Sequence, residues 1–75
     1  MKNIILNTAI RHGKPTIEGT RITVEEVLGA LAGGMTYEEV EREYGIAREG
    51  IVAAVRYAAA WIQGEEIAPL VLAHQ

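Results

Sequence analysis

The side chains best suited to chemistry in this chain are cations rather than nucleophiles or metal ligands. The 75 residues include no Cys, Ser or Asp, and the two His stand at positions 12 and 74 with no ligand spacing between them. Disulfides and thiolate metal sites are therefore excluded, and no arrangement typical of a nucleophile with its base is present. We expect no enzymatic activity, no metal and no cofactor. The cations that could contact DNA phosphates or bases are Arg11, Lys14, Arg21, Arg48 and Arg56.

Charge is unevenly divided along the chain. Residues 1–24 carry four cations against Glu18, which gives +3, and residues 25–75 carry three Arg against nine Glu, which gives −6; the two sum to the net −3. A basic N-terminal arm could bind the phosphates of a nucleic acid, whereas the acidic remainder of the chain would repel them. The alternative, which composition leaves open, is an arm with ordinary solvated surface charges.

The arm must be shaped by residues 13–26, GKPTIEGTRITVEE. Glu18 and Gly19 suit a two-residue turn, because Gly tolerates positive φ. The expected pairs around this turn are Ile17 with Thr20, Thr16 with Arg21 and Pro15 with Ile22. Pro15, Ile17, Thr20 and Ile22 would share a mostly apolar face, with Thr16 and Arg21 on the other. The apolar run of residues 4–6 predicts a short strand before the hairpin.

Two capping boxes predict where the first two helices begin. Thr23 with Glu26 precedes a helix over residues 24–32, which Gly33-Gly34 ends. Thr36 with Glu39 begins the second helix, and Gly45 closes it. A third, Ala-rich helix is predicted from Arg48 to Gln63, ended by Gly64. Because it is apolar nearly all round, we expect it to be buried on several sides.

The second helix, Gly45 and the third helix follow a helix-turn-helix pattern. The outward positions of the third helix would be Arg48, Glu49, Val52, Ala53, Arg56 and Ala60, of which only the two Arg can donate to phosphate or guanine. This favours a structural third helix over a base-reading one. The arm is the better candidate, since a β-ribbon from two subunits would present Arg11, Lys14 and Arg21 in pairs. The alternative is that Arg21 only forms a weak surface ion pair.

Apolar residues make up 49% of the chain, which is more than so small a domain can bury. We therefore expect a homodimer or a protein partner. The segment 65–75, with Ile67, Leu70, Val71 and Leu72, is predicted as a partner-binding tail. It could instead fold onto its own core or cross to another subunit, because Pro69 suits an extended arm. No membrane span or signal peptide is predicted.

These elements divide the chain into an arm (1–23), a three-helix core (24–64) and a tail (65–75). The predicted fold class is mainly α: a three-helix, homeodomain-like helix-turn-helix bundle with a short N-terminal β element.

The run GKPTIEGTRITVEEVLGALAGGMTYEEVEREYGI, with the Ala-rich helix that contains Tyr57-Ala58-Ala59, resembles the family called domain of unknown function 433. The resemblance covers residues 4–62 and is most specific at the GTRI core. It departs at Ala47, where the family often has Ser or Thr. It implies a homeodomain-like helix-turn-helix fold and an antitoxin of a VapBC-like module, whose partner would be a PIN-like nuclease.

The combined expectation is a small cytoplasmic, dimeric antitoxin-like protein that binds a nuclease toxin through apolar surface and its operator DNA through the arm. Two alternatives remain open at this point. One is a DNA-binding transcriptional regulator without a toxin partner. The other is a protein-interaction module that binds no DNA.

Overall fold

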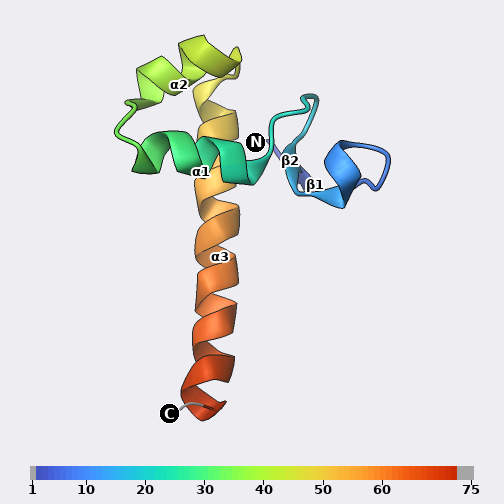
Figure 1. Ribbon diagram of the computed structural model, residues 1–75, viewed down its shortest axis with the longest axis vertical. Coiled ribbons are helices and arrows are strands. Elements are labelled where there is room, and N and C mark those ends of the chain that lie inside the picture. Colours follow the sequence, from blue (N-terminus) through green and yellow to red (C-terminus); the bar gives the residue numbers. More distant parts are fainter. Residues whose placement is uncertain (1, 73–75) are drawn as a thin grey trace.

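The computed structural model describes the backbone of residues 2–72 and the side chains of residues 2–63. Its elements are β1 (Ile4–Ile5), the 3-10 turn η1 (Arg11–Gly13), β2 (Thr16–Ile17), α1 (Val24–Ala32), α2 (Tyr37–Tyr44) and α3 (Arg48–Leu72). Figure 1 shows α3 as a long rod, with α1 and α2 gathered at its N-terminal end and the β element beside them. The prediction of a mainly α, three-helix fold with a short N-terminal β element is confirmed for the described residues.

The first two helices begin at the predicted capping boxes. The Thr23 hydroxyl accepts the Glu26 N–H at 3.0 Å, and the Glu26 carboxylate accepts the Thr23 N–H at 2.9 Å. Thr36 and Glu39 make the same reciprocal bonds at 3.1 and 2.8 Å. Each box satisfies main-chain donors that a helix start leaves without intrahelical partners. Local sequence therefore fixes where α1 and α2 begin.

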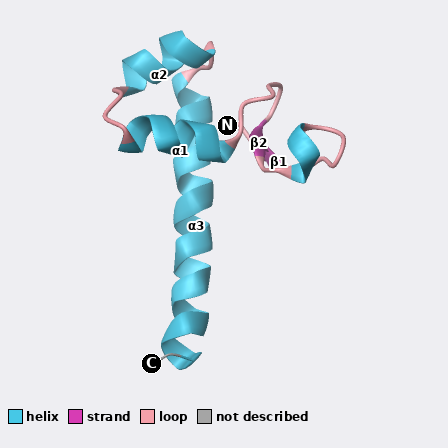
Figure 2. Ribbon diagram, in the orientation of Figure 1, coloured by secondary structure: helices cyan, strands magenta, loops and turns pink. Residues whose placement is uncertain are grey.

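The third helix extends well beyond its predicted end. It continues through Gly64 and Pro69 to Leu72, so the predicted end at Gly64 was wrong, and so was the alternative that residues 65–72 form an extended arm. Within a helix, Gly costs about 1 kcal/mol and Pro about 3 kcal/mol relative to Ala, so α3 continues in spite of two unfavourable residues. Figure 2 shows the result as one uninterrupted helical rod.

The core lies where α1, α2 and β2 meet the first turns of α3. Its buried members are Ile17, Val24, Val27, Val40, Ile46, Ile51 and Ala54. Gly50 allows this contact, because a Cβ at that position would lie only 3.1 Å from the buried Ile17 side chain. Burial of α3 on several sides was predicted for its whole length and holds only for this first part, since residues 59–63 are exposed.

The hairpin turn is confirmed, but its pairing is two residues out of the predicted register. Thr20 N–H bonds the Ile17 carbonyl across Glu18 and Gly19, whose φ is +79°. The ladder then pairs Ile17 with Ile22 through a 2.9 Å hydrogen bond, and Thr16 bridges to Thr23.

The Thr20 hydroxyl explains the longer loop. It donates to the Ile17 carbonyl at 2.8 Å and accepts the Ile22 N–H at 3.0 Å, so it closes the loop instead of pairing within the ladder. Thr16, which was expected on the outward side with Arg21, is 1% exposed.

The predicted N-terminal strand is present as β1, antiparallel to β2, with Ile4 opposite Ile17 and Ile5 opposite Thr16. Leu6, the last residue of the predicted run, lies outside the strand and is 64% exposed. Across the described residues, no helix has the length and apolar character needed to cross a membrane.

Candidate functional site

Two of the predicted arm cations are engaged with the start of α1. Arg11 Nη1 lies 3.1 Å from Glu26 Oε1 and also donates to the Arg21 carbonyl at 3.0 Å. Lys14 Nζ lies 2.9 Å from Glu25 Oε1. All four side chains are substantially exposed, so each pair contributes little to stability. Their effect is to hold the arm against α1 and to offset much of its positive charge.

Glu26 is the centre of this contact. One of its oxygens accepts from the Thr23 main chain, the Thr23 hydroxyl and Arg11. The main-chain N–H of Thr23 has the largest effect on the pKa of Glu26, and together with Arg11 it lowers that pKa below the ordinary value of 4.5. The carboxylate therefore stays ionised and links the arm, the turn and α1.

Arg21 differs from the other two arm cations. It lies on the exposed loop between the paired residues, next to Arg11, which bonds its carbonyl. Among the residues whose side chains are described, its guanidinium is in no ion pair. Of the predicted arm residues, Arg21 thus presents the charge that is least offset by acidic neighbours.

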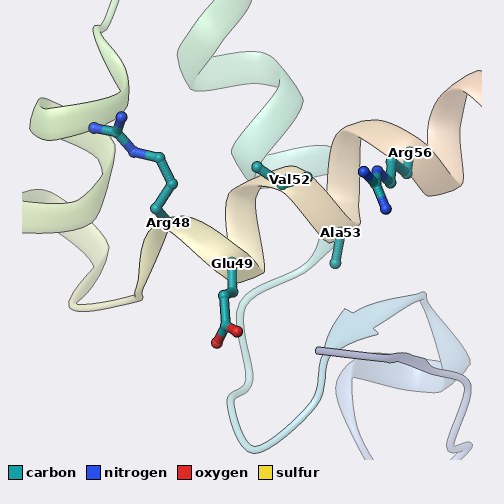
Figure 3. Close-up of a pocket in the computed structure, with 5 residues that line it drawn as sticks. All are labelled: Arg48, Glu49, Val52, Ala53 and Arg56. Carbon is teal, nitrogen blue, oxygen red and sulfur yellow. The ribbon is translucent and has the colours of Figure 1, made fainter. Parts of the chain in front are cut away.

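Arg48 connects α2 to α3. Its Nε lies 3.2 Å from Glu41 Oε2, and its guanidinium stands 5.2 Å from the centre of the Tyr37 ring. Figure 3 shows its side chain extending away from Arg56, toward the neighbouring helix. Both contacts are with α2, which indicates a role in fixing the angle between the two helices.

The outer side of α3 carries a shallow hollow of about 360 Å³. Its lining is Arg48, Glu49, Val52, Ala53 and Arg56, all from the first turns of the helix (Figure 3). These are five of the six positions predicted to face outward, although Ala53 is only 8% exposed. Val52 and Ala53 are its apolar lining residues, and Arg48, Glu49 and Arg56 are its charged ones.

A second hollow, of about 590 Å³, follows β1 where it lies beside α3. It is lined by Lys2, Asn3, Ile4, Ile5, Ala53, Arg56 and Tyr57. Ala53 and Arg56 belong to both hollows, so the two adjoin. Sequence reasoning missed this surface because residues about 50 positions apart form it, and no local pattern marks such a contact.

The distal part of α3 presents apolar side chains to solvent. Trp61 is 56% and Ile62 57% exposed, and Ala59 and Ala60 are exposed beside them. The predicted tail residues Ile67, Leu70, Val71 and Leu72 continue the same helical backbone, but their side chains lie outside the described part of the structure. Over the described residues, no three His, Asp or Glu side chains are grouped so that they could hold a metal ion.

The five predicted DNA-binding residues therefore do not form one cluster. Arg11, Lys14 and Arg21 belong to the arm, whereas Arg48 and Arg56 belong to α3. Three of the five pair with glutamates.

Comparison with known proteins places this arrangement in a family. "Putative antitoxin VapB45" of Mycobacterium tuberculosis (strain ATCC 25618 / H37Rv) is 34% identical over 44 residues, which are 59% of this chain and 18% of that protein. The X-ray crystal structure of Rv2018 from Mycobacterium tuberculosis matches with a TM-score of 0.63 and 29% identity, over 69% of this chain and 24% of that one. The chain thus spans about a fifth to a quarter of these relatives. Residues 4–58 match the family described as "Protein of unknown function (DUF433)", and the chain belongs to this family.

Proposed function

We propose that the protein is an antitoxin-like component of a type II, VapBC-like module, which acts by binding a PIN-like ribonuclease toxin rather than by catalysis. The observation that carries this proposal is the exposed apolar surface of α3 at Trp61 and Ile62, which are each more than half exposed. The similarity to "Putative antitoxin VapB45" supports a toxin as the partner.

Physical reasons favour the distal part of α3 as the toxin-binding element. Apolar area removed from water contributes roughly 25 cal/mol per Å², so a Trp and an Ile together supply a useful part of an interface. Tryptophan is also enriched among the residues that dominate binding energy. A helix that projects from its domain suits insertion into a groove of the partner. The segment 65–75, which continues α3, would extend the same contact.

The test is capture of a PIN-like nuclease, sought in the reading frame that adjoins this gene. The two proteins are co-expressed, and both recovery of the complex and rescue of growth are measured. We expect Trp61→Glu to lose capture and rescue, because it places a charge in the apolar contact. Leu6→Glu is the matched control, since Leu6 is also more than half exposed but lies near β1. Equal capture by Trp61→Glu and wild type would refute the proposal.

Operator binding forms the second part of the proposal, with α2, Gly45 and α3 as a helix-turn-helix and the arm as the main phosphate contact. The exposed position of Arg21 supports the arm. Arg21→Ala should weaken binding to the gene's own upstream DNA and reduce the salt slope by about one. Arg56→Ala should have the smaller effect, and the reverse order would assign DNA reading to α3. If the protein captures the toxin but does not bind the upstream DNA, it is a protein-interaction module without operator binding.

We also propose that the protein is a homodimer, because the surface of a single chain exposes Leu6, Trp61 and Ile62. Sedimentation equilibrium at micromolar concentrations measures this directly. A single monomeric species over the whole range would contradict it.

A further inference from the structure

The outer edge of β1 offers main-chain groups that the small sheet does not engage. Ile4 stands opposite Ile17, whose N–H is directed to the Ile22 carbonyl on the far side. The pair before it, Asn3 and Glu18, is hydrogen-bonded: the Glu18 N–H donates to the Asn3 carbonyl at 2.9 Å. Since paired and unpaired positions alternate along an antiparallel ladder, the N–H and C=O of Ile4 point away from β2. β1 is therefore an open edge strand.

The hollow beside α3 follows this edge. It is lined by Lys2 and Asn3, which precede β1, and by Ile4 and Ile5 of β1, so side chains of both faces of this stretch contribute. A hollow confined to one face would touch only alternate residues. A chain lying in it could therefore reach the outward-facing main-chain groups of Ile4 and contact α3 at Ala53 and Tyr57.

The charge of this hollow is opposite to that of the protein. Its charged lining residues are Lys2 and Arg56, with no acidic side chain among them, whereas the whole chain has a net charge of −3. The remaining lining is largely apolar, with Ile4, Ile5 and Tyr57. The matching ligand would alternate carboxylates with apolar side chains, which is the pattern of an acidic strand with one face against an apolar surface.

We propose that β1 and the hollow beside it bind an extended acidic segment of a partner protein, which adds to the sheet as a further strand. Main-chain hydrogen bonds to Ile4 would set the direction of the segment, and Lys2 and Arg56 would pair with its carboxylates. At about 3.3 Å per residue, residues 2–5 give about 13 Å of edge, enough for four ligand residues. This surface is distinct from the distal part of α3, so the proposal stands or falls independently of toxin capture there.

Two other occupants fit the hollow less well. A second copy of β1, paired around Ile4, would bring its own Lys2 to a site that already holds two cations. A nucleic acid backbone would place phosphates against Ile4, Ile5 and Tyr57, and Glu49 lines the adjoining hollow. An acidic peptide satisfies both the charge and the apolar lining.

The experiment uses the full chain and two blocked hexapeptides, one alternating aspartate with valine and one alternating lysine with valine. Fluorescence anisotropy measures affinity, and two-dimensional amide NMR locates the site. We expect the acidic peptide to bind at least tenfold more tightly than the basic one. Ile4 and its neighbours should show the largest amide shifts.

Variants separate the main-chain contribution from the charge. Ile4→Pro removes the outward N–H and should weaken binding at least tenfold, whereas Ile4→Val keeps that N–H and should stay within twofold of wild type. Arg56→Gln should weaken binding of the acidic peptide. Arg56→Lys, which keeps the positive charge, should weaken it less. Thermal unfolding of each variant identifies any that fail to fold, and the Arg56 pair then decides the question alone.

Three results would overturn the proposal. The first is equal binding of the two peptides, and the second is unchanged affinity in Ile4→Pro or, where that variant does not fold, in Arg56→Gln. The third is loss of the bound acidic peptide when the protein self-associates or when duplex DNA is added, with shifts of the same amides. Self-association would assign the edge to a second copy, and DNA binding would assign it to nucleic acid.

Discussion

The first half of α3 and the described start of its second half, residues 61–63, differ in burial although both are rich in apolar residues. In the first half, Ile51 and Ala54 are fully buried beneath α1, α2 and β2, whereas in the second Trp61 and Ile62 are more than half exposed. Nothing interrupts the helix between them. The difference arises from how far the other elements reach along the rod (Figure 1). Apolar content therefore predicts that a helix needs cover, but it does not tell whether that cover belongs to the same chain.

The largest effect that this comparison predicts is on folding. Ile51→Ala removes a fully buried side chain from the centre of the core and should lower the free energy of unfolding by about 2–5 kcal/mol. Ile62→Ala, the matched substitution in the distal half, should change it by less than about 0.5 kcal/mol. Urea denaturation at concentrations where the protein is monomeric measures both. Similar losses from the two substitutions would show that the halves are not distinct.

A smaller effect is expected at the start of α2, which covers the first half of α3. Thr36→Ala removes the hydroxyl that accepts the Glu39 N–H and should cost about 1 kcal/mol of stability. Thr36→Ser keeps the hydroxyl and should remain close to wild type. Thermal unfolding of the two variants gives the difference, and an equal loss in Ser and Ala would rule out the cap as its source.

The smallest effect concerns Glu26, which links the arm to α1. Its pKa is lowered in the folded state, so its contribution is complete above pH 4.5 and is lost as the pH falls through the lower folded value. Glu26→Gln should therefore be less stable than wild type at pH 7, with the difference shrinking as the pH falls below about 4.5. Denaturation curves from pH 7 to pH 3 measure this. A difference that stays constant over that range would refute it.

Local chemistry predicted the features that depend on neighbouring residues. The two capping boxes and the Glu18-Gly19 turn each rest on residues within four positions of one another, and the structure confirms them. The helix α1 has the predicted bounds for the same reason.

The features that sequence did not predict depend on distant contacts or on small energy differences. The hairpin register is set by the Thr20 hydroxyl and by burial of Thr16, and a shift of two residues keeps the alternation of faces, so the sequence pattern could not distinguish the two registers. The pairing of Arg11 with Glu26 joins residues 15 positions apart. The hollow along β1 is likewise formed by residues 2–5 and by α3, and the order of elements along the chain does not predict that these two lie side by side.

The unbroken backbone of α3 also determines how the protein opens from one end. Between Ala54 and Gln63 the helix has no cap or loop at which fraying toward the core would stop. A helical segment without tertiary cover is marginal in water, so the exposed turns unwind with little cost until they reach residues that the core holds. Amide hydrogen exchange should therefore slow progressively from Gln63 back toward Ala54, and a ligand that covers the exposed turns would flatten this gradient.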